Sequence, residues 1–75
     1  MREEDKKLVW ESFSSVRAYL SHPEALEERI EELSKEDLSL DGFVEEFGNL
    51  TSVAADPTEK TDWRIFLNDL RSRLS

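Results

Sequence analysis

The sequence predicts an all-α protein in which four short helices form one compact bundle. Apolar and aromatic residues recur at spacings of three and four along four separate segments, which is the pattern of helices with one buried face. No Val- and Ile-rich run alternates with polar residues, so we expect no strand. A chain of 75 residues suffices for one domain, and we expect a single acidic helical domain over residues 1–75.

The first helix is expected from about Glu3 to Leu20. Its apolar stripe follows i, i+4, i+7 and i+11, with Val9, Phe13, Val16 and Leu20. Trp10 and Tyr19 fall roughly 90° to either side of that stripe, since each residue turns the helix by about 100°. Because its apolar face is so wide, we expect this helix to form the centre of the core.

The second helix is expected from about Pro23 to Leu33. Ser21, with Glu24 three residues later, matches a capping box, and Pro23 fits the first helical turn. The residues predicted to face inward are Ala25, Ile30 and Leu33, with Leu26 at the margin.

The third helix is expected from about Leu40 to Ala54, after a connection in which Ser39 or Asp41 provides the cap. Its inward residues are Leu40, Phe43, Phe47, Leu50 and Ala54. Gly42 and Gly48 each cost about 1 kcal/mol in a helix relative to Ala, so we expect a bend or a later start.

The fourth helix is expected to run to about Leu74, starting at Pro57 behind an Asp56 cap or at Asp62 behind a Thr61 cap. Its apolar face consists of Trp63, Phe66, Leu67, Leu70 and Leu74. The residues predicted to be most firmly buried in the protein are Phe13, Val16, Phe47, Phe66 and Leu70. Leu8 on the first helix and Ile65 on the fourth lie off their stripes, Ile65 among Asp62, Asn68 and Asp69, so both are candidate exposed contact points.

The net charge of minus eight is confined to residues 24–46. That segment holds only two bases, Arg29 and Lys35, whereas each flank is neutral. A localised negative field attracts and steers a basic partner. The candidate partner-binding residues are Ile65 and the ten acids of the segment, namely Glu24, Glu27, Glu28, Glu31, Glu32, Glu36, Asp37, Asp41, Glu45 and Glu46.

Residues 37–44 resemble the opening of an EF-hand calcium loop. Asp37, Ser39 and Asp41 occupy loop positions 1, 3 and 5, and Gly42 occupies position 6. The resemblance fails at position 12, where Gly48 replaces the acid that completes the calcium shell. A weak calcium site in this segment is one alternative, and a simple helix cap at Ser39 or Asp41 is the other.

No residue pattern indicates catalysis. The single histidine, His22, stands in a turn beside Pro23, with Ser21 as its only neighbouring hydroxyl. The chain has no cysteine, and one histidine is too few for a zinc site. We therefore expect no enzyme activity, no cofactor and no bound metal.

The charge pattern favours a non-catalytic module that docks the acidic segment on a basic site of a partner protein. Phosphate contacts need clustered Lys and Arg, so we expect no direct binding to nucleic acid. In the sharper form of this hypothesis, the partner is itself a protein that handles nucleic acid. We expect no membrane contact and a cytoplasmic location, since no apolar run approaches the roughly 20 residues of a membrane span. In size, charge and helicity the chain is similar to bacteriocin immunity proteins and phage-encoded inhibitors, which implies an inhibitor or regulator. A self-associating helical module is the alternative.

Overall fold

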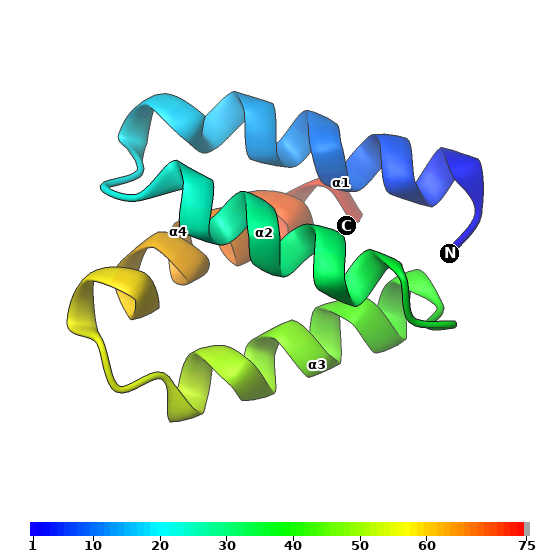
Figure 1. The fold of residues 1–75 in the computed structure, drawn as a ribbon. Helices are drawn as coiled ribbons and strands as arrows, with labels where there is room; N and C mark the ends of the chain where they lie inside the picture. Colours follow the sequence, from blue (N-terminus) through cyan, green and yellow to red (C-terminus); the bar gives the residue numbers. More distant parts are fainter. Residues whose placement is uncertain (75) are drawn as a thin grey trace.

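Residues 1–74 are described by a computed structural model, and they form four α-helices joined by short connections (Figure 1). The helices are α1 (Glu3–Val16), α2 (Pro23–Ser34), α3 (Leu40–Val53) and α4 (Pro57–Leu74), with a 3₁₀ turn, η1 (Arg17–Tyr19), after α1. Successive helices run in opposite directions, so the α1–α2 and α3–α4 turns share one end of the bundle (Figure 1). The predicted all-α fold of four short helices is confirmed.

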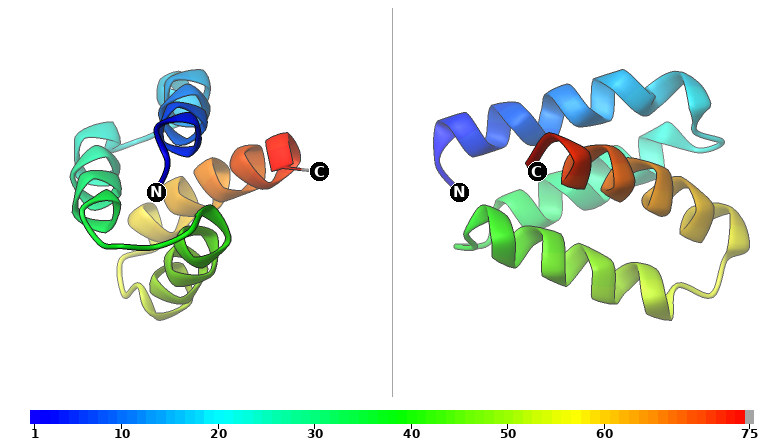
Figure 2. Two further views of the ribbon diagram at one scale, coloured as in Figure 1. Left: turned by 90° about the vertical axis from the view of Figure 1, so that its right-hand side faces the viewer. Right: turned by 180° about the vertical axis from the view of Figure 1, so that it is seen from behind.

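The helix α4 is the element that packs against each of the other three helices. Figure 2 shows α4 crossing the bundle diagonally, with its later turns lying between α1 and α3. The expectation that the first helix forms the centre is therefore wrong. The reason is that the 18-residue α4 is the longest helix and touches α1, α2 and α3 in turn.

Aromatic rings fill the space between α3 and α4. The Phe47 ring lies 5.5 Å from the Trp63 ring and 5.4 Å from the Phe66 ring, centroid to centroid, and it also contacts Phe43. The five residues predicted to be buried, Phe13, Val16, Phe47, Phe66 and Leu70, all belong to the core. Leu26 is fully buried, whereas Ala25 is only partly buried, because Leu26, Ile30 and Leu33 form the regular i, i+4, i+7 stripe of α2.

Side-chain caps set two of the helix starts. Ser39 Oγ accepts a hydrogen bond from Gly42 N at 3.1 Å, which makes Ser39 rather than Asp41 the cap of α3. Asp56 Oδ1 accepts from Thr58 N at 2.8 Å, and α4 begins at Pro57 rather than at Asp62. The helix α3 starts at Leu40, so the later start considered for it is wrong.

The predicted capping box at Ser21 is wrong. The cap position of α2 is His22, and no side chain there bonds the first turn. Instead, Asp62 of α4 accepts hydrogen bonds from Ser21 N at 3.0 Å and from His22 N at 2.9 Å. Asp62 is only 2% exposed, so its carboxylate ties the turn between η1 and α2 to α4 from inside the protein. The prediction that Asp62 lies on the outer face of the fourth helix beside Ile65 is therefore also wrong.

A second polar contact joins α1 to α4. The hydroxyl of the buried Ser12 donates to Asp69 Oδ2 at 2.7 Å, and Arg73 Nε donates to the same oxygen at 2.7 Å. The hydrogen bond from Arg73 lowers the pKa of Asp69 below its ordinary value, with a further contribution from Ser12, while burial acts in the opposite direction. A buried hydroxyl with a carboxylate partner stabilises the helix pair, because neither group is left without a hydrogen bond.

Replacing Phe47 by Ala should lower the free energy of unfolding by about 3–5 kcal/mol, because the change removes a fully buried ring that three other rings contact. Urea unfolding followed by circular dichroism measures this loss. Val53→Ala is the control on the same helix, since Val53 is 76% exposed. Equal losses from the two variants would show that α3 does not pack through Phe47.

Replacing Asp62 by Ala should cost about 1–3 kcal/mol, since two backbone N–H groups lose a charged acceptor. Asp62→Asn should lose less, because the amide retains one acceptor oxygen. The same unfolding measurement on Asp37→Ala serves as the control, as Asp37 is exposed. If Asp62→Ala unfolds like that control, the carboxylate does not hold the turn.

The stabilisation from Asp69 should depend on pH. Its folded-state pKa is lowered from the ordinary 3.8, so its contribution is complete above that value and disappears as the pH falls through the lowered pKa. The difference in unfolding free energy between the wild type and Asp69→Asn, measured in urea, should therefore shrink at acid pH. An unchanged difference between neutral pH and about pH 2 would contradict the role of the ionised carboxylate.

Candidate functional site

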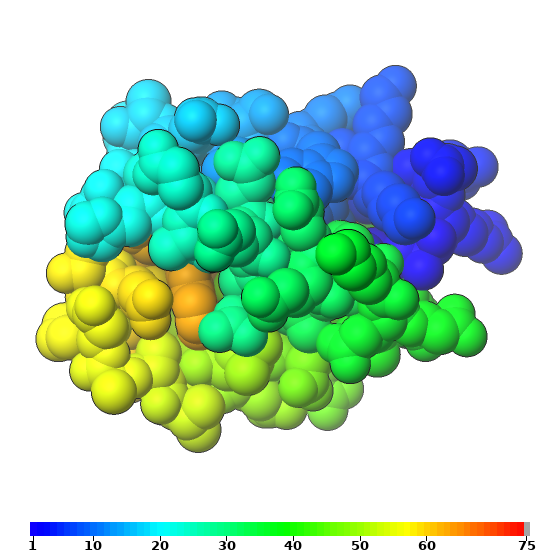
Figure 3. All heavy atoms as spheres, viewed as in Figure 1, coloured from blue at the N-terminus to red at the C-terminus, as the bar shows by residue number. Residues whose placement is uncertain are grey.

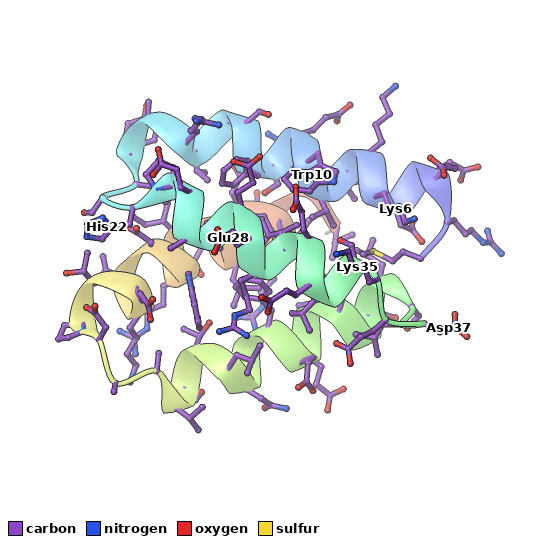
Figure 4. All side chains as sticks on the ribbon, viewed as in Figure 1. Lys6, Trp10, His22, Glu28, Lys35 and Asp37 are labelled. Carbon is purple, nitrogen blue, oxygen red and sulfur yellow. The ribbon has the colours of Figure 1, made fainter. Side chains whose placement is uncertain are left out.

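The outer side of α2 carries a row of free carboxylates. Glu24, Glu28 and Glu31 follow i, i+4 and i+7, and all three side chains are exposed. Within residues 1–74 none of the three makes an ion pair. Figure 4 labels Glu28 on the outward side of α2, the helix nearest the viewer in Figure 1. We call Glu24, Glu28 and Glu31 the α2 ridge.

Two bases near the ridge, Arg29 and Arg17, contact other groups. Arg29 contacts Glu32 at 3.1 Å, and its guanidinium carbon lies 5.6 Å from the centroid of the Trp63 ring on α4. Arg17 of η1 approaches Glu27 at 3.9 Å. Glu27 and Glu32 thus have cationic neighbours. The single base within α2 is directed toward α4, and Lys35, which follows Glu31 at i+4, makes no ion pair with the ridge within residues 1–74.

The other five acids of the segment, Glu36, Asp37, Asp41, Glu45 and Glu46, are exposed in the connection and on α3. By helical spacing, Asp41 and Glu45 share a stripe of α3 with Gly48 and Ser52. That stripe approaches α4, because a Cβ at Gly48 would lie 3.3 Å from a terminal nitrogen of Arg71, and Lys60 Nζ donates to Ser52 O at 3.5 Å. Asp41 and Glu45 therefore lie on the stripe of α3 that adjoins α4. The α2 ridge is the part of the segment in which three exposed carboxylates line one side of a single helix.

A stripe of bases on α4 was not predicted from the sequence. Lys60, Arg64 and Arg71 are spaced at i, i+4 and i+11, so they lie along one side of the helix, next to α3. Residues 47–75 carry no net charge, so their total charge gives no sign of this stripe. The i, i+4 and i+11 spacing of the three bases does indicate it.

The EF-hand-like segment does not form a calcium loop. The helix α3 begins at Leu40, the fourth position of the supposed loop, and Ser39 Oγ caps that helix. Asp41, at loop position 5, therefore has a helical backbone, whereas the backbone of an EF-hand loop at that position wraps around the bound ion. No group of three or more His, Cys, Asp or Glu side chains among residues 1–74 is arranged to hold a metal ion.

The apolar candidates occupy different positions from those predicted. Leu8 and Ile65 are partly buried against the core, so their expected exposure is wrong. Trp10 is also partly buried, with its ring edge-on to Phe13 at 5.8 Å between centroids. Two shallow, solvent-open hollows on α1 meet at Trp10 and Lys7. Tyr19, by contrast, is 75% exposed.

Comparison with protein-family models, with curated proteins and with solved structures finds no match to this chain. None of the described helices is both long and apolar enough to cross a membrane. The structure itself therefore defines the candidate site, which is the α2 ridge on a small all-α bundle.

Proposed function

We propose that this protein is a non-catalytic binding module that docks the α2 ridge on a basic surface of a partner protein and thereby inhibits or regulates that partner. The observation that carries the proposal is the set of three exposed carboxylates, aligned along one helix and without ion-pair partners in residues 1–74. A row of this kind presents its charge outward, where a second molecule can neutralise it.

Helix stability alone does not account for the ridge. Glu24 and Glu28 are a like-charge pair at i, i+4, as are Glu28 and Glu32, and each such pair destabilises a helix by about 0.2–0.5 kcal/mol. A domain of this size has a thin core and a small free energy of unfolding, so such costs matter. Binding of a basic partner would remove the repulsion by neutralising the carboxylates.

The chemistry of the ridge specifies the partner. Exposed carboxylates without an ion-pair partner accept hydrogen bonds from Lys and Arg, and their field raises the association rate of a positively charged surface. Proteins that handle nucleic acid have basic surfaces for phosphate, so occupation of such a surface is the sharper form of the proposed inhibition. Direct binding of the ridge to nucleic acid is opposed by the sign of its charge.

Reversal of the ridge charges should slow the association of this protein with its partner. Glu24→Lys, Glu28→Lys and Glu31→Lys together change the net charge from minus eight to minus two. A matched control makes the same change in net charge with Glu3→Lys, Glu4→Lys and Glu11→Lys, three exposed acids of α1. Proteins from the native host that bind the wild type are the partners to purify, and both triple variants are then compared on them.

The association rate with that purified partner, measured by stopped flow, then shows whether the ridge or only the total charge steers binding. The ridge variant should associate about ten- to a hundredfold more slowly at low salt, with a flatter salt dependence, because steering is lost. Equal slowing by both triple variants would mean that only total charge matters. Unchanged rates for the ridge variant would contradict the proposed docking surface.

A further inference from the structure

Arg29 joins an aromatic ring of α4 to a glutamate of its own helix. Its guanidinium carbon lies 5.6 Å from the centroid of the Trp63 ring, and its Nη1 donates to Glu32 Oε2 at 3.1 Å. A guanidinium suits this position, because its flat cationic face packs on a ring while its edge donates to a carboxylate. Lysine lacks the flat, forked group that makes both contacts together. One ring and one carboxylate thus form a place for an arginine.

The same arrangement occurs between η1 and α2. The guanidinium carbon of Arg17 lies 5.8 Å from the centroid of the Phe13 ring, and its Nη1 approaches Glu27 Oε2 at 3.9 Å. Both distances from a guanidinium to a ring are within the range of a cation–π contact. The protein therefore holds an arginine between a ring and a glutamate of α2 twice, once with a ring of α1 and once with a ring of α4.

Trp10 of α1 and Glu31 of α2 lie in neighbouring positions on these two helices. Trp10 precedes Arg17 by seven residues, so both belong to the side of α1 that faces α2. Glu31 follows Glu27 by four residues, so both belong to the side of α2 that faces α1. Because the two helices are antiparallel (Figure 1), these steps from the Arg17–Glu27 contact run in the same direction. They amount to about 10 Å along α1 and about 6 Å along α2, at about 1.5 Å per residue.

The pair of Trp10 and Glu31 is accessible and holds no arginine. Figure 4 shows Trp10 between the levels of Glu28 and Lys35 along α2, as this register requires. In Figure 3 the surfaces of α1 and α2 adjoin on this face, with no other element between them. Trp10 is partly buried and Glu31 is exposed. Within residues 1–74 no arginine forms a cation–π contact with Trp10 or an ion pair with Glu31.

We propose that Trp10 and Glu31 together bind an arginine side chain of the partner. Its guanidinium packs on the Trp10 ring and donates hydrogen bonds to the Glu31 carboxylate, as Arg29 does with Trp63 and Glu32. The inference rests on the proposed function, because Glu31 belongs to the α2 ridge and the arginine belongs to the protein that docks there. It specifies the basic surface of the partner, which presents arginine rather than lysine at this point.

Two lysines border the pair. Lys35 follows Glu31 by four residues on α2, and Lys6 precedes Trp10 by four residues on α1. Within residues 1–74 neither makes an ion pair or a cation–π contact. Their charges repel an incoming guanidinium, so Lys35→Gln should tighten the binding of an arginine peptide by about two- to fivefold at low salt.

Capped hexa-arginine and hexa-lysine peptides, which carry the same charge, test the proposal on the isotope-labelled protein. Backbone amide and indole N–H chemical shifts are followed in each titration at low salt. Hexa-arginine should bind the wild type about two- to fivefold more tightly than hexa-lysine and should shift the indole N–H signal of Trp10. The Trp63 indole is the internal control and should shift little, since its ring is 5% exposed and already contacts Arg29.

The preference for arginine should disappear when either half of the pair is removed. Trp10→Leu and Glu31→Gln should each bind the two peptides about equally. Tyr19→Leu replaces an aromatic ring that is 75% exposed outside the pair, and Glu24→Gln replaces a ridge carboxylate two turns from Glu31. Both of these matched controls should retain the preference. Glu31→Gln changes an exposed side chain, so it keeps the test decisive if Trp10→Leu, which removes a ring in contact with Phe13, fails to fold.

Two results would overturn the arginine site. One is equal binding of the two peptides to the wild type, and the other is a preference that persists in Trp10→Leu and Glu31→Gln. If the peptides still shift the α2 amides in either case, the proposed docking surface stands without the arginine site. Unchanged α2 amides with both peptides would contradict the α2 ridge and the arginine site together.

Discussion

The packing of α3 and α2 on α4 is the constraint from which the rest of the structure follows. Phe47 contacts Trp63 and Phe66, and this aromatic cluster fixes α3 against α4. One turn before Phe66 on α4, the buried Asp62 accepts the two N–H groups that precede α2. Apolar burial and charge-assisted hydrogen bonds thus act on neighbouring residues of one helix. Because the turn is fixed, the start of α2 is fixed as well, and with it the side of α2 that faces solvent.

The arrangement of charge follows from that orientation. The buried stripe of Leu26, Ile30 and Leu33 faces inward, which leaves Glu24, Glu28 and Glu31 on the outer side. Arg29 approaches the Trp63 ring, so the only base of α2 supports the contact with α4 rather than neutralising the ridge. The acids of α3 differ, because Asp41 and Glu45 share a stripe with residues that approach Lys60 and Arg71. One segment of sequence thus supplies both an isolated acidic row and an acidic stripe near bases.

The spacing of apolar residues along the chain predicted the helices well. It could not predict polar contacts between residues that are far apart in the sequence. Four helical segments, the caps at Ser39 and Asp56 and the main core residues follow from spacings within a few residues. Asp62 looked exposed because it stands off the apolar stripe, and its partners at Ser21 and His22 are about 40 positions away. The first helix was predicted to run to about Leu20, and its end was wrong for another reason. The chain changes to a 3₁₀ turn after Val16, so the angle of 100° per residue no longer applies. The α2 ridge was contained in the predicted acidic segment, but separating free from paired carboxylates required the positions of Arg17 and Arg29.

The central claim is that the α2 ridge is the surface that meets a partner. The most direct measurement is a titration of the isotope-labelled protein with its purified partner, followed by backbone amide chemical shifts. The largest shift changes should fall in α2, along residues 24–32, and the outer side of α1 around Glu3, Glu4 and Glu11 should change little. Shift changes concentrated on α1 or on the basic side of α4, with α2 unchanged, would contradict the claim.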